Sequence, residues 1–120
     1  MKQLFQRWVL VILWLLVIFA GSSVGNLPHA DSKAIDVIIH RTGHLIEYAI
    51  LGALLVRAWR QHRSIVWRDV IIVIIACGLY GFSDEWHQSF TVGRSSELSA
   101  VLFDMAGGLI GAVIYRWWRR

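Results

Sequence analysis

The chain has 120 residues, of which 57% are hydrophobic and only 17% are charged. This balance lies outside the range of ordinary soluble proteins, so it favours one membrane domain, residues 1–120, over a soluble helical bundle. The formal net charge of +4 does not indicate a nucleic-acid partner, because the basic residues are distributed between apolar runs.

The first apolar run, residues 8–24, contains no charged side chain. Its length approaches the roughly 20 residues that cross a hydrocarbon core of about 30 Å, so we predict a transmembrane helix. A cleaved signal peptide is the alternative, because a basic start precedes the run and small residues, Ala20 to Ser23, lie near its end. The following stretch, GNLPHADSKA, carries the only proline and is expected to turn.

The second apolar run, residues 35–56, is interrupted by polar side chains at spacings of three and four, which places them on one face of a helix. This polar stripe consists of Asp36, His40, His44, Glu47 and Tyr48, and Leu51 continues it. Exposing the stripe to hydrocarbon would cost a few kcal/mol per group, so it is expected to face protein or a wet cavity. Interhelical hydrogen bonds that only hold a bundle together are the alternative, but five polar residues favour a site.

The third run comprises thirteen uncharged residues, 70–82, and is followed at once by a polar segment, residues 84–88. If the helix continues, Asp84, His87 and Gln88 share a face, because they are three and four positions apart. Glu85 lies off this face and is a candidate partner of Arg94 in the next connection. The lone cysteine, Cys77, is expected to be a buried small hydrophobe.

Arg94 follows the polar segment, in the stretch TVGRSS. A guanidinium group binds phosphate or carboxylate through two parallel hydrogen bonds, so Arg94 is a candidate anion clamp. An ordinary pairing with Glu97 is the alternative.

The fourth run, residues 98–118, contains the carboxylate of Asp104. A carboxylate inside a membrane segment is a functional hypothesis by default. Gly107 and Gly111 form a small-residue pair that permits close helix packing, and Asp104 precedes Gly107 and Gly108 by one turn. Asp104 is therefore expected to point into the same packed interface.

The basic residues predict an orientation. Nine of the twelve Lys and Arg residues precede the first run, lie between the second and third, or occur near the end of the fourth and after it. Short basic loops remain cytoplasmic, so four crossings place both termini in the cytoplasm and the polar segment 84–88 at the outer face. Tryptophans flank the basic side, as in an interfacial belt: Trp8, Trp59, Trp67, Trp117 and Trp118.

Several of these residues form a recognisable pattern. The motif Tyr-Gly-x-x-Asp-Glu-x-x-Gln-x-Phe-x-x-Gly-Arg spans residues 80–94, His44 and Tyr48 form an upstream His-x-x-x-Tyr element, and Asp104 begins an Asp-x-x-Gly element. Over about residues 35–112 the chain resembles the VanZ-like family of small bacterial membrane proteins, named after low-level resistance to the glycopeptide teicoplanin. Arg41 stands where family members often have Lys, and Ala100 where they often have Asp.

The polar stripe, the polar segment 84–88 and the family resemblance together predict an all-α protein that crosses the bacterial plasma membrane four times. Its outward-facing site would handle an anionic envelope lipid or precursor. Arg41 and Arg94 would hold the headgroup, His44 or His87 would transfer a proton, and Asp84 would orient a histidine or act as the base. The candidate catalytic residues are His44, Asp84, His87 and Asp104, and the candidate ligand-binding residues are Arg41, Glu47, Tyr48, Glu85, Gln88 and Arg94.

Other functions stay open at this point. A divalent ion on Asp84, His87 and Asp104 is a variant, although the spacing matches no established metal signature, and no metal is assigned. A non-catalytic protein could use the same groups to bind or shield an envelope component, or only to pack its helices. Transport is less favoured, since four helices leave little room for alternating access. Cofactor use and oligomeric state are not predicted.

Overall fold

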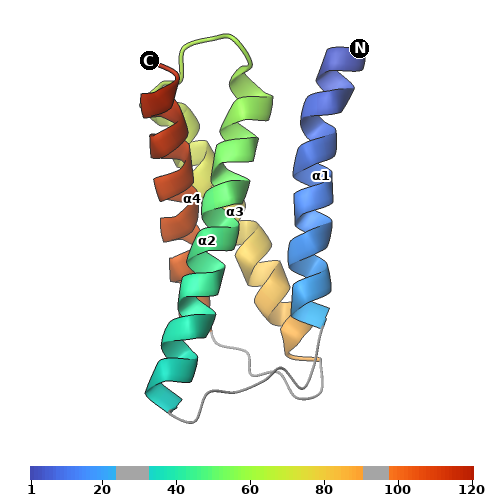
Figure 1. Cartoon of the computed structure of the whole chain (residues 1–120). Helices are drawn as coiled ribbons and strands as arrows, with labels where there is room; N and C mark the ends of the chain where they lie inside the picture. The colour runs from blue at the N-terminus through green and yellow to red at the C-terminus, as the bar shows by residue number, and fades with distance from the viewer. Residues whose placement is uncertain (24–32, 91–97) are drawn as a thin grey trace.

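The computed structural model describes residues 1–23, 33–90 and 98–120. Over these residues the chain forms a bundle of four helices (Figure 1): α1 (Lys2–Ser23), α2 (Lys33–Arg60), α3 (Trp67–Gln88) and α4 (Ser99–Trp118). Each predicted apolar run forms one helix, which confirms the all-helical expectation. The third helix continues to Gln88, so the polar segment 84–88 is helical, which was the condition for its spacing of three and four to place residues on one face.

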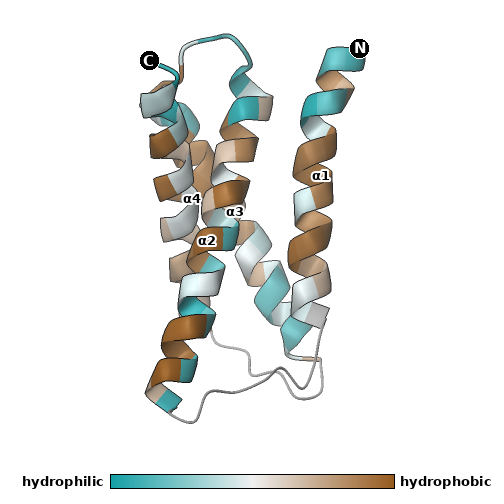
Figure 2. Ribbon diagram, in the orientation of Figure 1, coloured by the Kyte–Doolittle hydropathy of each residue, from teal (hydrophilic) through white to brown (hydrophobic). Residues whose placement is uncertain are grey.

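Three of the helical segments are long and apolar enough to cross a membrane: residues 2–22, α3 and α4. With 28 residues, α2 is the longest helix, but its polar stripe lowers its hydropathy. Figure 2 shows hydrophobic residues along all four helices, hydrophilic residues near helix ends and further hydrophilic residues within α2. Large apolar side chains are exposed around the bundle, for example Leu13, Ile46, Leu79 and Leu102. A soluble bundle would bury such side chains, so the outer surface fits a lipid environment.

The packing centres on α4, which contacts both α2 and α3, whereas α1 contacts α2 and α3 but not α4 in the described ranges. Figure 1 shows α1 standing at one side of the bundle. The close approach of α2 to α4 depends on glycine, since a Cβ atom at Gly111 would overlap the carbonyl group of Ala49. A Cβ atom at Gly107 would lie 3.0 Å from the Cβ of Tyr48. The predicted role of this glycine pair is confirmed, and Cys77 is fully buried as expected.

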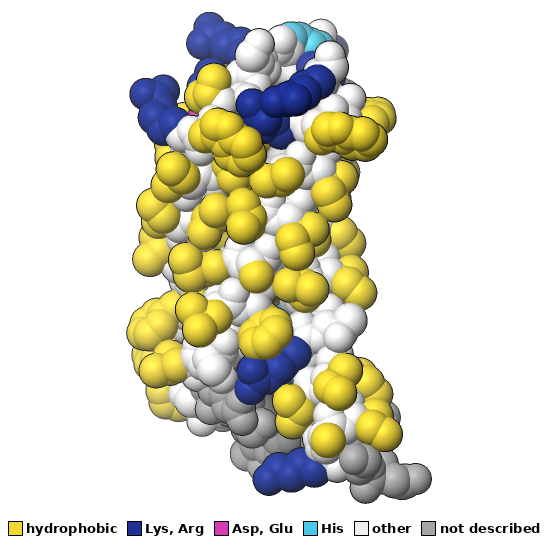
Figure 3. Space-filling view, turned by 90° about the vertical axis from the view of Figure 1, so that its left-hand side faces the viewer, with side chains coloured by type: hydrophobic (Ala, Val, Ile, Leu, Met, Phe, Trp, Pro, Cys, Tyr) yellow, Lys and Arg dark blue, Asp and Glu magenta, His cyan; other side chains and the backbone are white. Residues whose placement is uncertain are grey.

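Both termini lie at the same end of the bundle as the connection between α2 and α3 (Figure 1). Figure 3 shows Lys and Arg side chains gathered at this end, which we call the basic end. Here α2 terminates as Gln61 adopts a left-handed φ of 55°. Asp69 closes the connection, because its Oδ2 accepts hydrogen bonds from Arg60 Nε at 2.6 Å and from the Val66 amide at 2.9 Å.

Candidate functional site

A histidine–aspartate pair joins α2 to α4. His44 Nδ1 lies 2.8 Å from Asp104 Oδ1, and Asp104 is fully buried while the His44 side chain is 14% exposed. Helix α3 completes the surroundings of Asp104, because a Cβ atom at Gly81 would overlap Asp104 Oδ2. Asp104 therefore lies where α2, α3 and α4 meet. This confirms the expectation that its side chain points into the packed helix interface.

Two buried oxygen atoms beside this pair have no hydrogen-bond partner among the described residues: Tyr48 Oη and Asp104 Oδ2. Tyr48 follows His44 by one helical turn, with the two rings stacked at 6.4 Å between centroids. A buried polar atom left unpaired costs about 1–3 kcal/mol, so native structures rarely keep one without a reason. One of the two atoms belongs to a hydroxyl donor and the other is a carboxylate acceptor.

The rest of the α2 stripe also faces inward. Asp36, His40 and Glu47 are partly buried, whereas Ile38 and Ile39, on the opposite side of the helix, are 64% and 59% exposed. The exposure pattern therefore supports the predicted direction of the stripe.

Arg41 lies close to the first turns of α4. Its guanidinium carbon is 4.9 Å from the centre of the Phe103 ring, and its Nη2 lies 3.4 Å from Ser99 Oγ.

The polar segment of α3 turns toward the same region. Asp84, Glu85 and Gln88 are all at most 5% exposed, and Gln88 Nε2 donates a hydrogen bond to Asp84 Oδ2 at 3.3 Å. Asp84 is close enough to Asp104 and Tyr48 to interact with both electrostatically. The spacing placed Glu85 off the face of Asp84 and Gln88, which was wrong, because Glu85 is as buried as Gln88.

Glu85 and Glu47 approach the histidine of the pair. Both carboxylates act electrostatically on His44, Glu47 from the next turn of α2 and Glu85 from α3. The structure thus brings together seven candidate residues, which we call the polar cluster: His44, Glu47, Tyr48, Asp84, Glu85, Gln88 and Asp104.

His87 takes a different direction. Its ring stacks on Phe19 of α1, with 4.6 Å between centroids and 26° between planes. Among the described residues, no three His, Cys, Asp or Glu side chains are arranged to hold a metal ion. The structure therefore does not bring Asp84, His87 and Asp104 together as a three-residue metal site, because the His87 ring stacks on α1.

Arg94 and its alternative partner Glu97 lie outside the described residues. The role of Arg94 as an anion clamp stays a prediction from the sequence, and so does a pairing with either Glu85 or Glu97.

Two hydrogen bonds that join α1 to α2 and α3 were not predicted. Trp14 Nε1 donates a hydrogen bond to the Glu47 carbonyl at 2.8 Å, and Tyr80 Oη donates to the Leu15 carbonyl at 2.7 Å. The sequence carried a signal for both, because a tryptophan or tyrosine deep in an apolar segment needs an acceptor for its polar atom.

The chemistry of the polar cluster follows from its charges. Three carboxylates, Glu47, Glu85 and Asp104, act on the His44 imidazole, and Asp84 lies near Asp104 and Tyr48. Carboxylates accept hydrogen bonds from hydroxyl groups, and a histidine held by a carboxylate can exchange protons through its other ring nitrogen. Because Asp104 engages Nδ1 of His44, Nε2 is the nitrogen available for such an exchange.

Apolar helices of membrane-spanning length, packed around buried polar residues, define a small helical membrane protein. The family model for VanZ/LLP1 matches residues 5–119, and the chain belongs to this family. This match confirms the resemblance found in the motifs and reaches beyond residues 35–112 at both ends. Searches of curated proteins and of solved structures gave no significant match.

Proposed function

We propose that this VanZ-family protein is a multi-pass protein of the bacterial plasma membrane whose polar cluster binds the headgroup of an anionic envelope lipid or lipid-linked precursor. The observation that carries the proposal is the pair of unpartnered buried oxygens, Tyr48 Oη and Asp104 Oδ2. A hydroxyl group can accept from the first and donate to the second, and lipid headgroups and sugar-bearing precursors are rich in hydroxyls.

The anionic part of the ligand would be held by arginine. Arg41 belongs to α2 and lies beside the first turns of α4, where it contacts Ser99 and Phe103. Arg94 would join Arg41 from the α3–α4 connection. The carboxylates of the polar cluster would repel a bare anion. The phosphate of the ligand would therefore bind the arginines, and its hydroxyl groups would bind the carboxylates.

The proposal includes a placement in the membrane. α2 would be the fourth span, with its polar stripe shielded by α3 and α4 and its isoleucines toward lipid. The basic end would lie in the cytoplasm, since short basic segments remain on that side, and the end carrying residues 84–88 would open outward. A ligand drawn from the outer leaflet would then reach the cluster directly, and a cell-wall precursor as ligand would connect the protein with glycopeptide resistance.

Catalysis on the bound lipid is a second step of the proposal. The His44–Asp104 pair has the composition of a general acid–base dyad, in which Asp104 orients the imidazole and Nε2 exchanges the proton. A His44→Gln variant that retains the same amount of lipid, but with a chemically different headgroup from the wild type, would establish turnover. Identical lipid in both proteins would identify a binder.

A static network is the competing account, and internal contacts favour it in part. Gln88 binds Asp84, and Arg41 reaches Ser99, so some of the polar groups satisfy one another inside the bundle. In that account the cluster only fixes the packing of α2, α3 and α4.

Two tyrosine variants separate the accounts. Tyr48→Phe removes a hydroxyl that has no partner, so the variant should be at least as stable as the wild type in lipid-free detergent. Tyr80→Phe removes the hydrogen bond to Leu15 and should lower the free energy of unfolding by about 0.5–1.5 kcal/mol.

Added lipid should then stabilise Tyr80→Phe more than Tyr48→Phe, the reverse of their order of stability in lipid-free detergent. A total lipid extract should raise the melting temperature of the wild type and of Tyr80→Phe, since a ligand that binds only the folded state stabilises it. The increase should be smaller for Tyr48→Phe. Equal increases for both variants would favour the static network.

A further inference from the structure

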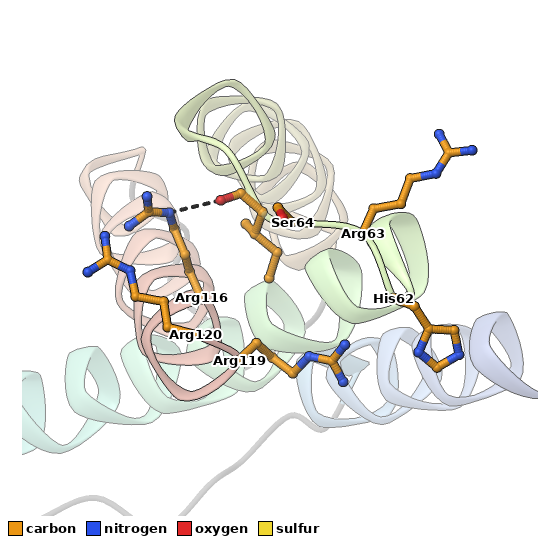
Figure 4. A pocket seen from close by; sticks show the side chains of 7 residues that line it. His62, Arg63, Ser64, Arg116, Arg119 and Arg120 are labelled. Atoms are coloured by element: carbon orange, nitrogen blue, oxygen red, sulfur yellow. Dashed lines mark hydrogen bonds between the residues drawn. The ribbon is translucent and has the colours of Figure 1, made fainter.

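A second polar region lies at the basic end, away from the polar cluster. A cavity of about 380 Å³ opens there between the α2–α3 connection and the end of α4. Its lining consists of His62, Arg63, Ser64, Ile65, Arg116, Arg119 and Arg120. Figure 4 shows Arg116, Arg119 and Arg120, from the last turn of α4 and the two residues after it, on one side of the cavity, and His62, Arg63 and Ser64 on the other.

Two of the arginines are fixed in place by the backbone. Arg116 Nε donates to the Ile65 carbonyl at 3.0 Å, and Arg119 Nη2 donates to the Gln61 carbonyl at 3.1 Å. The guanidinium carbon of Arg116 also lies 4.4 Å from the centre of the Trp67 ring. These contacts join the walls of the cavity and use only a few of the five N–H donors that each guanidinium carries.

The positive charge of this cavity is not balanced by nearby acids. Within the described part of the chain, none of its four arginines forms an ion pair with an aspartate or glutamate, and no carboxylate side chain lines it. Asp69 is the acid at this end, and it is already bound by Arg60. Four guanidinium groups around one cavity therefore form a site suited to an external anion.

The chemistry and position of the site indicate which anion. Guanidinium groups match the geometry of phosphate oxygens, and Ser64 adds a hydroxyl donor. Trp67, Trp117 and Trp118 are exposed around the same end, as tryptophans are at the level of lipid headgroups. We propose that the basic-end cavity binds a phosphate-bearing anion, either the headgroup of an anionic lipid or a free phosphate.

The experiment compares two double variants that lose the same charge. Arg119→Gln/Arg120→Gln removes two lining arginines, and Lys2→Gln/Arg68→Gln removes two exposed cations at the same end that do not line the cavity. Binding of sodium phosphate and of dioctanoylphosphatidylglycerol to each detergent-purified protein is followed by thermal shift at constant ionic strength. Unchanged melting temperatures without added anion would show that both variants fold.

We expect Arg119→Gln/Arg120→Gln to bind the anion at least about tenfold more weakly than the wild type. Each hydrogen bond to a charged group contributes enough free energy to change the dissociation constant by about this factor. The control variant should stay within a factor of about two of the wild type, since its cations act only over a screened distance. Preference for the lipid over phosphate would identify a headgroup site, and similar affinities would identify a phosphate site. Equal losses in both variants, or no response to either probe, would overturn the proposal.

Discussion

Asp104 is the residue on which the candidate site depends most, because it is fully buried where α2, α3 and α4 meet. Its importance followed from the sequence, since a carboxylate in an apolar helix is rarely incidental. Its partner did not follow, because His44 lies on another helix and 60 positions away. Spacing along one helix reveals which residues share a face, but not which face of another helix they meet.

The contribution of the His44–Asp104 pair to the free energy of unfolding can be measured by replacing His44. His44→Leu would leave Asp104 buried without its partner, which should lower the free energy of unfolding by about 1–3 kcal/mol. His40→Leu is the matched control, because His40 lies one turn earlier and forms a more exposed pair with Asp36. Its cost should stay below about 1 kcal/mol. Chemical denaturation in detergent gives both values, and equal costs would contradict the assigned burial of the His44–Asp104 pair.

At the scale of helices, the sequence predicted more than it did for single contacts. The helix α3 does continue beyond its apolar run, which was the condition attached to the spacing of Asp84, His87 and Gln88. The stripe on α2 was predicted to face protein, and its side chains are partly or fully buried. The stacking of His87 on Phe19 was missed, since nothing in the spacing of α3 tells which neighbour lies on the far side of its polar face.

The close contact between α2 and α4 can be tested by making the same substitution, glycine to alanine, at two positions. Gly111→Ala would push a methyl group into the backbone of Ala49 and should destabilise the bundle despite the better helix propensity of alanine. Gly43→Ala meets no atom within 4 Å and should be neutral or stabilising by up to about 1 kcal/mol. Thermal unfolding in detergent reads out both variants. A Gly111→Ala variant as stable as Gly43→Ala would mean that α2 and α4 are further apart.

For the whole molecule, the distribution of basic residues was the most informative feature of the sequence. It predicted that both termini and the α2–α3 connection share one end of the bundle, and the structure places them there (Figure 1). The cavity at this end could not be predicted, because its walls are joined by hydrogen bonds between segments far apart in the sequence. Arg116 and Arg119 donate these hydrogen bonds to backbone carbonyl groups of the α2–α3 connection. The direction of the bundle across the membrane stays a prediction from charge.

Cysteine labelling tests this direction and the fourth span together. In a Cys77→Ala background, single cysteines at Lys33, Ser64 and Ser89 mark the start of α2, the basic end and the end of α3. A reagent that cannot cross the membrane should label positions 33 and 89 from outside and position 64 only after the cells are opened. Labelling of positions 33 and 64 from the same side would show that α2 does not cross.

The most direct test of the polar cluster as a lipid site is native mass spectrometry of the intact protein released from detergent. The wild type should carry one phosphate-bearing lipid that remains bound after weakly held lipids are removed by collisional activation. Tyr48→Phe, which keeps the fold but loses the unpartnered hydroxyl, should carry much less of this lipid, and Tyr80→Phe should carry as much as the wild type. A wild-type protein without a retained lipid, or equal retention by Tyr48→Phe, would contradict the proposed site.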